Sequence, residues 1–285
     1  MVRIAYIIQA HKNPAAINKL IAALDTAETD FYVHIDSKSD IVDKIETKDN
    51  VFVLENRVDV RWGHISQVEA TLTLMRAVKG SGKKYDYVWL ISGQDYPIKS
   101  NGYIQKKLSE DLNANYIEII EKTDERYLRY LKRNQTWYPS WGASPKFIMR
   151  VLRKLYNYAT GGMTRSWYKR KNYLGVEWAF GSSWFAITYQ TMLYILDEVE
   201  KKPYLKYYTN CICADESMFQ TILYNSEYAG TCKGNLLYVD WSEGKKNPKN
   251  LGIEDLEALK QSDKLIARKF EGSIPEEIES LSKEK

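Results

Sequence analysis

The stretch Tyr87-Val88-Trp89-Leu90-Ile91-Ser92-Gly93-Gln94-Asp95 decides which fold the sequence predicts. Tyr87 to Ile91 is an apolar, β-favouring run, which is typical of a strand buried on both faces of a parallel sheet. Gly93 and its polar neighbours then end the strand in a loop. Polar loops after buried strands are typical of α/β sheets that bind ligands beyond the carboxyl ends of their strands.

The sequence before this strand alternates short strands and helices. One helix is expected after Asn13-Pro14, an N-cap and first-turn pair, and another at Ser66-Gln67-Val68-Glu69, which has the pattern of a capping box. Further strands are expected at Arg3 to Gln9, Phe31 to Ile35 and Val51 to Leu54. The order strand, helix, strand, strand, helix, strand predicts a Rossmann-like, mostly parallel sheet flanked by helices.

Polar residues follow three of these predicted strands. Gln9 and His11 come at the end of the first strand, Asp36 follows the second, and Asp95 follows the strand that begins at Tyr87. Each residue alone also fits an ordinary turn or cap. Because the carboxyl ends of neighbouring parallel strands meet at one edge of a sheet, we expect the set to form a ligand site there.

The second half of the chain continues with elements of the same kind. Asp215 is expected to cap the helix that contains Phe219, which places Glu216 in its first turn, where the helix dipole favours an ionised carboxylate. Residues 276–285 are expected to fray. The remaining expected elements are strands at Ser183 to Thr188 and Leu236 to Trp241, and helices at Gln190 to Val199 and Glu254 to Gln261.

The segment from Arg126 to Asn172 differs in composition from the rest of the chain. It holds 12 Lys or Arg residues and no Asp or Glu, so the remainder carries a formal charge of −8 although the whole chain carries +4. Ten Trp, Tyr or Phe side chains are interleaved with these charges. Such a mixture favours a phosphate-rich partner, either nucleic acid or an anionic membrane surface, with a solvated helical face as the alternative.

Composition and cysteine content narrow the class of protein. The 285 residues are 44% hydrophobic and 27% charged, which is typical of a globular chain with a sizeable core. Three cysteines, Cys211, Cys213 and Cys232, predict neither a disulfide framework nor a standard zinc site. The short apolar start before His11 is not expected to span a membrane or to be a cleaved leader. A reducing cytoplasm is therefore the expected compartment.

Several motifs occur together in an order that resembles a known family. The chain is similar to the core-2/I-branching β-1,6-N-acetylglucosaminyltransferases and peptide O-xylosyltransferases, as a bacterial member, with only about Asn101 to Val176 unmatched. The matching residues are Ile4-Ala5-Tyr6-Ile7-Ile8 with His11; Tyr32-Val33-His34-Ile35-Asp36 with Lys38; Trp62 with Ser66, Val68 and Ala70; Leu90-Ile91-Ser92-Gly93-Gln94-Asp95-Tyr96-Pro97-Ile98-Lys99; Gly181-Ser182 with Trp184-Phe185; Asp215-Glu216; and Ala267-Arg268-Lys269-Phe270.

The resemblance implies an inverting, metal-independent glycosyltransferase of the GT-A type, with a basic helical insertion. It implies one domain over residues 1–285. Residues 1–100 would bind the nucleotide sugar, residues 101–176 would form the insertion and residues 177–275 would hold the acceptor and the catalytic residues.

By this resemblance Glu216 is the general base, a role that direct displacement at the anomeric carbon requires. Asp215 is its nearest competitor, and is otherwise expected to bind the acceptor. Two basic side chains would stabilise the departing diphosphate. Lys269 matches one of them, and Lys246 stands where animal members have Arg. Lys245, Lys249 and Arg268 are alternatives to Lys246 or additions to the pair.

The resemblance also assigns the two substrates to residues. His11 and Asp36 would bind the uracil and ribose region, and Asp95 would lie near the donor sugar or support its loop. Trp184, Tyr238 and Trp241 are candidates for stacking on acceptor sugars, although core packing explains such aromatics equally well.

We therefore expect a cytoplasmic enzyme that moves a sugar from a UDP-sugar to a glycan hydroxyl without a cofactor. N-acetylglucosamine is the first choice of sugar and xylose the second. The basic segment favours a lipid-linked acceptor at the inner face of the cell membrane, as in bacterial polysaccharide assembly. The alternatives are a metal-dependent transferase that uses Asp95, and a non-catalytic sugar-binding module. Nucleic-acid binding is disfavoured because the rest of the chain is acidic.

Overall fold

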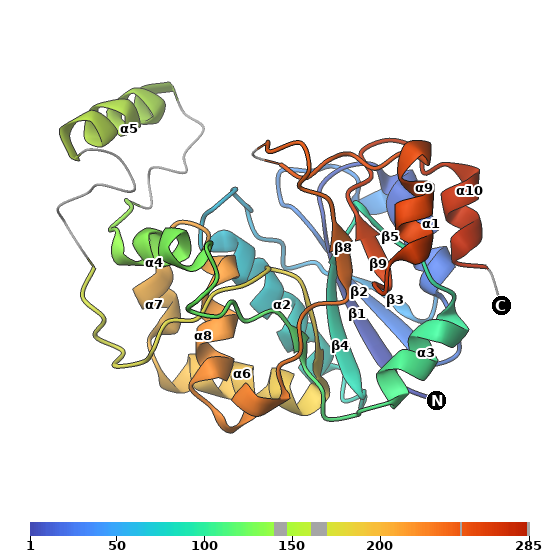
Figure 1. The fold of residues 1–285 in the computed structure, drawn as a ribbon. Coiled ribbons are helices and arrows are strands. Elements are labelled where there is room, and N and C mark those ends of the chain that lie inside the picture. The colour runs from blue at the N-terminus through green and yellow to red at the C-terminus, as the bar shows by residue number, and fades with distance from the viewer. Residues whose placement is uncertain (140–146, 161–169, 246, 284–285) are drawn as a thin grey trace.

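A computed structural model describes residues 1–139, 147–160, 170–245 and 247–283. A six-stranded mixed sheet lies at its centre (Figure 1). The strands β3, β2, β1 and β4 are parallel, and β7 and β6 extend the sheet with antiparallel pairing. In sheet order they are β3 (Val51–Val53), β2 (Thr29–Ile35), β1 (Ile4–Ala10), β4 (Tyr87–Ser92), β7 (Phe185–Thr188) and β6 (Tyr116–Ile117). The predicted mostly parallel sheet is confirmed.

Helices cover both faces of this sheet because its central strands are apolar on both sides. In β1, Tyr6 and Ile8 join a core with α1 and α3, whereas Ala5 and Ile7 join a core with α2, α6, α7 and α8. These alternate directions follow from the two-residue period of a strand. The helices are α1 (Pro14–Leu24), α2 (Ser66–Gly80), α3 (Asn101–Ser109), α6 (Tyr189–Lys201), α7 (Tyr204–Tyr208) and α8 (Met218–Tyr224).

A smaller sheet packs beside the first with its own core. It consists of β5 (Asp95–Pro97), β9 (Ile266–Arg268) and β8 (Leu237–Val239), and it is covered by α9 (Leu256–Gln261) and α10 (Glu276–Leu281). Residues 276–281 are therefore not a frayed tail, because Ile278 and Leu281 are buried in this core. The strand expected over Leu236 to Trp241 ends at Val239, which leaves Trp241 outside it.

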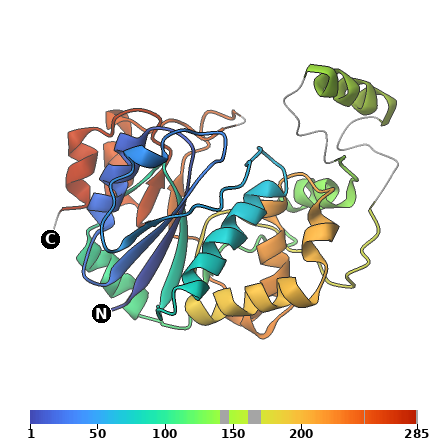
Figure 2. The same cartoon turned by 180° about the vertical axis from the view of Figure 1, so that it is seen from behind.

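The basic segment begins with two helices, α4 (Tyr127–Gln135) and α5 (Phe147–Thr160). Figures 1 and 2 show α4 beside α7 and α8, whereas α5 stands away from the body of the protein in both views. Short 3₁₀ helices complete the described structure: η1 (Val42–Lys44), η3 (Ala214–Glu216), η4 (Glu227–Thr231) and η5 (Ile253–Asp255).

Two expected helix caps differ from those observed. Ser66 does not cap α2 through its side chain, because the helix begins at Ser66 itself and its Oγ accepts a hydrogen bond from the backbone of Arg61 at 2.9 Å. Asp215 lies inside η3 rather than at the N-cap of α8, where Ser217 stands instead. The predicted cap of α1 is confirmed, since Asn13 accepts from the backbone N–H of Ala16.

Candidate active site

The polar residues that follow β1, β2 and β4 meet at one edge of the large sheet, as predicted. The strands lie in the order β2, β1, β4, and Asp36 is joined to the end of β1 by a backbone hydrogen bond to Ala10 at 2.9 Å. Gly93 makes the matching bond to Gln9 at 3.0 Å. Any side chain at Gly93 would approach Ile17 in α1 to 2.8 Å, so the turn after β4 needs glycine for close packing.

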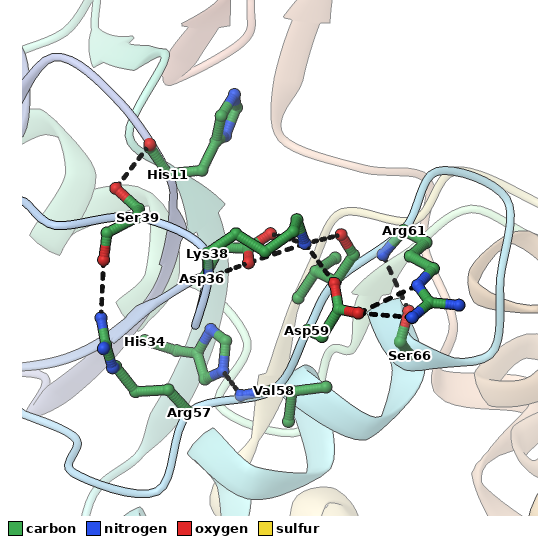
Figure 3. Close-up of polar contacts among 11 residues, drawn as sticks. His11, His34, Asp36, Lys38, Ser39, Arg57, Val58, Asp59, Arg61 and Ser66 are labelled. Carbon is green, nitrogen blue, oxygen red and sulfur yellow. Dashed lines mark hydrogen bonds and ion pairs between the residues drawn. The ribbon is translucent and has the colours of Figure 1, made fainter. Parts of the chain in front are cut away.

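Asp36 is held by a basic side chain that the sequence analysis noted only as part of a motif. Lys38 Nζ donates to both carboxylate oxygens at 2.8 Å and also to Asp59 at 2.5 Å. Arg61 then bonds the other oxygen of Asp59, which extends the chain of alternating charges (Figure 3). This network fixes the direction in which Asp36 presents its carboxylate at the sheet edge.

His11 follows β1 and lies beside this network. Its backbone carbonyl accepts a hydrogen bond from Ser39 at 2.9 Å, and its ring points away from Asp36 and Lys38 (Figure 3). Desolvation, and then the charge of Lys12, lower the pKa of His11. A shallow hollow of about 380 Å³ opens beyond the ends of β2 and β3, and Ser39, Val53 and Arg57 are among its lining residues.

Asp95 is fully buried at the start of β5. Ser92 donates to it twice, from its backbone N–H at 2.8 Å and from its Oγ at 2.7 Å. Burial raises the pKa of Asp95, and the charge of Arg268 opposes the rise. The two bonds from Ser92 tie the carboxylate to the loop that follows β4.

Arg268 faces Asp95 across the small sheet, where β5 and β9 pair these two residues. Its Nε lies 3.6 Å from the Asp95 carboxylate, and its guanidinium lies 4.1 Å above the ring of Trp184. In the described part of the chain, its buried Nε and Nη1 find no hydrogen-bond partner. Buried guanidinium groups normally satisfy their N–H donors, so this arrangement has capacity for an anionic or hydroxyl ligand.

The lysines expected at the diphosphate differ in their burial and in their ion-pair partners. Lys269 follows Arg268 directly and is largely covered, with its ammonium 2.9 Å from Glu271. Lys249 bonds Asp255 at 2.6 Å, which ties its ammonium to the start of α9. Lys245 pairs with Glu243 at 2.8 Å. Lys246 lies outside the described residues.

Asp215 and Glu216 form a second acidic cluster in η3. Asp215 accepts from Ser183 Oγ at 2.7 Å, while its Oδ1 is buried with no hydrogen-bond partner among the described residues. Glu216 accepts from Arg133 Nη1 at 2.7 Å. Burial raises the pKa of Glu216 to about 7, with Asp215 adding to the rise and Arg133 opposing it. The prediction that Glu216 lies in the first turn of the helix, where its dipole would favour the charge, is wrong, because Glu216 belongs to η3 and α8 begins only at Met218.

Arg133 is the residue of this cluster that the sequence analysis did not single out. It lies on α4 and reaches Glu216 across 83 positions of sequence while its guanidinium stacks on Tyr130 at 5.0 Å. The sequence shows it only as one of 12 basic residues in the Arg126 to Asn172 segment. Its contact with Glu216 forms only in the folded protein, where α4 lies against η3.

Ser183 and Trp184 connect the two clusters. Ser183 bonds Asp215 in η3, and the next residue carries the ring on which Arg268 lies. Because consecutive Cα atoms are about 3.8 Å apart, the Glu216 cluster and the Arg268 cluster lie on either side of one short segment. Gly181, at the start of that segment, donates its backbone N–H to the carbonyl of Glu216 at 3.0 Å.

The aromatic residues expected at an acceptor have different environments. Trp184 is partly buried between both helix-covered cores. Tyr238 packs against the core of the small sheet, in agreement with the alternative that these aromatics fill a core. Trp241 is 56% exposed and therefore available to a ligand.

Two further properties concern metals and membranes. Among the described residues, no three or more His, Cys, Asp or Glu side chains gather in a way that could hold a metal ion. None of the described helices is both long and apolar enough to cross a bilayer.

Comparisons with known proteins identify the family of this chain. The model of the Core-2/I-Branching enzyme family matches residues 4–261. The chain therefore belongs to the Core-2/I-Branching enzyme family.

Its curated relatives are named as sugar transferases. Human xylosyltransferase 2 is 25% identical over 97% of this chain and 33% of its own length. A zebrafish (Danio rerio) β-1,3-galactosyl-O-glycosyl-glycoprotein β-1,6-N-acetylglucosaminyltransferase 4 is 24% identical over 77% of this chain and 49% of its own. The chain thus spans a third to a half of these relatives. The structure of mouse xyloside xylosyltransferase 1, in its apo form, aligns over 93% of this chain and 97% of that chain with 11% identity and a TM-score of 0.38.

Proposed function

We propose that this protein is an inverting glycosyltransferase that moves a sugar from a UDP-sugar to a glycan hydroxyl. One observation carries the proposal. A carboxylate that titrates near neutral pH, Glu216, lies one short segment away from Arg268, a buried guanidinium with unused donors. Direct displacement needs a base on one side of the reacting carbon and positive charge on the side of the leaving group.

In the proposed reaction Glu216 takes the proton of the acceptor hydroxyl. The acceptor oxygen forms a bond to the anomeric carbon while the bond from that carbon to the diphosphate oxygen breaks. The electron pair remains on UDP, whose growing charge Arg268 and Lys269 stabilise. A base is most effective when its pKa is near the working pH, and the value of about 7 at Glu216 meets this condition.

We propose that this reaction needs no metal, because Arg268 and Lys269 supply the positive charge at the leaving group. His11 and Asp36 would bind the nucleoside at the ends of β1 and β2, and Trp184 and Trp241 would contact sugar rings. UDP-N-acetylglucosamine is the proposed donor and UDP-xylose the alternative, since relatives of both kinds match the chain. The proposed acceptor is a lipid-linked glycan at the cytoplasmic face of a membrane.

The proposal is tested by UDP release from a panel of UDP-sugars, with and without excess chelator. We expect slow hydrolysis of one donor that the chelator leaves unchanged. Glu216→Gln should lose acceptor-stimulated turnover by about 10²- to 10⁴-fold, the usual contribution of a general base, while still binding the donor. Glu200→Gln, which changes an exposed carboxyl on α6, is the matched control.

Three results would count against the proposal. Loss of turnover in chelator would favour a metal-dependent reaction at Asp95. Full turnover of Glu216→Gln would remove the assigned base. If no UDP-sugar is bound or cleaved, the chain is better explained as a sugar-binding module.

A further inference from the structure

Among the described residues, helix α5 contacts the rest of the protein through one side. Tyr156 donates a hydrogen bond to the backbone carbonyl of Trp137 at 3.2 Å, and the two rings lie 6.1 Å apart. Met149 and Arg153 are partly covered on the same side of the helix. At 3.6 residues per turn these three residues fall within an arc of about 60°. The opposite side of α5 therefore faces away from the body of the protein.

That opposite side is apolar, which is the reverse of what an ordinary surface helix shows. Six large apolar or aromatic side chains lie within an arc of about 140° and are all exposed. Their exposed fractions are Phe147 72%, Ile148 67%, Val151 40%, Leu152 42%, Leu155 58% and Tyr158 91%. Scattered apolar side chains on a surface are normal, but a continuous face of this kind marks an interaction site.

Positive charge borders this apolar face. Arg150 and Lys154 are exposed and project beside Phe147, between the apolar arc and the side that contacts Trp137. The whole segment from Arg126 to Asn172 has no acidic residue, whereas the remainder of the chain carries −8. The partner of this face must therefore accept both apolar side chains and the two cations at its border.

We propose that α5 docks the protein on an anionic lipid bilayer. In this orientation the apolar arc enters the boundary between headgroups and acyl chains, and Arg150 and Lys154 reach the lipid phosphates. Phe147 and Tyr158 suit headgroup depth. A helix of 14 residues is too short to span the bilayer, so it lies parallel to the surface. The docking requires no transferase activity and goes beyond the proposed function.

Vesicle co-sedimentation of the full-length protein tests this docking. Phosphatidylcholine vesicles are compared with vesicles that contain about 30% phosphatidylglycerol, a composition with a strongly negative surface. Ile148→Ser with Leu155→Ser removes apolar contact, and Arg150→Glu with Lys154→Glu reverses the bordering charge. The matched controls change exposed residues elsewhere on the chain: Leu112→Ser with Ile253→Ser, and Lys84→Glu with Lys106→Glu.

We expect the wild type to bind the anionic vesicles, to bind less as salt is added, and to bind pure phosphatidylcholine weakly. Each α5 double variant should lose about tenfold or more in vesicle affinity, and each control should bind like the wild type. Donor hydrolysis should be unchanged in the α5 variants, which separates this result from a failure of the proposed chemistry.

The docking proposal is overturned if the wild type ignores anionic vesicles or if the controls lose as much binding as the α5 variants. A third outcome also overturns it. If sedimentation velocity shows a dimer that Ile148→Ser with Leu155→Ser dissociates, while vesicles bind neither protein, the apolar face is covered by a second copy of the chain.

Discussion

The site contains two pairs of one carboxylate and one arginine that differ in almost every respect. Asp95 is fully buried and satisfied by Ser92, and Arg268 approaches it only to 3.6 Å. Glu216 is partly exposed and bonded directly to Arg133 at 2.7 Å. In the first pair the arginine has unused donors, whereas in the second pair the carboxylate is the group that titrates near neutral pH.

This difference indicates which member of each pair is able to contact a substrate. Asp95 is fully buried and held by Ser92, so a substrate does not reach its carboxylate, and in the proposed reaction it positions Arg268. Glu216 is partly exposed and has a raised pKa, so in the proposed reaction it takes the proton and Arg133 positions it. The two arginines should therefore respond differently to the same substitution.

Of the two arginine substitutions, Arg268→Met should have the larger effect. It removes the buried positive charge beside the proposed leaving group, so we expect turnover to fall by about 10²-fold or more. The measurement is UDP release at saturating donor, with circular dichroism to confirm that the variant folds. Arg268→Lys keeps a point charge and should recover part of the rate.

The matched control for this prediction is Arg76→Met, which changes an exposed arginine on α2 and should leave turnover unchanged. Normal turnover of a folded Arg268→Met protein would contradict the distinction between the pairs.

Arg133→Met should have a smaller and pH-dependent effect. Glu216 must be ionised to accept a proton, so kcat/KM rises as the pH rises through its pKa of about 7. Arg133 opposes the rise of that pKa, and its removal should move the acidic limb of the profile upward by about one pH unit. The rate should fall about tenfold below neutral pH and recover at high pH.

The profile of kcat/KM against pH measures this effect. Lys132→Met changes an exposed neighbour on the same helix and provides the control. An equal loss of rate at every pH would mean that Arg133 contributes structure or substrate binding, and not the pKa of Glu216.

The sequence pointed to both residues of the first pair, Asp95 and Arg268, but only to Glu216 in the second. Asp95 follows the strand that begins at Tyr87, and Arg268 lies in a short motif, so local sequence patterns marked both residues as site candidates. The sheet itself was predictable for the same reason, since the apolar runs of β1, β2 and β4 show their period directly. Short-range patterns are what a sequence displays most clearly.

The second pair depends on contacts that no local pattern displays. Arg133 pairs with a residue 83 positions away, and its neighbours in sequence suggested only a basic surface. The cap predicted at Asp215 failed for a related reason. The backbone forms a separate 3₁₀ turn before α8, and the carboxylate bonds Ser183 instead of the helix N-terminus. In both cases a tertiary contact overrode the local preference.

The last prediction concerns stability, and it separates Glu216 from ordinary surface carboxyls. Its pKa is about 7 in the folded protein against a usual value of 4.5. Below pH 4.5 the Glu216 carboxyl is protonated in both the folded and the unfolded protein, so it does not change the free energy of unfolding. As the pH rises from 4.5 to 7 the unfolded chain releases this proton first, so stability falls by up to about 3 kcal/mol and then levels off.

Glu216→Gln lacks this titration, so its melting temperature relative to the wild type should rise by a few degrees between pH 5 and pH 8. Scanning calorimetry at several pH values measures the difference, and Glu200→Gln is again the control. A difference that stays constant with pH would show that folding does not disfavour the charge on Glu216. Glu216 would then form an ordinary ion pair with Arg133, and the proposal that it is the base would rest on geometry alone.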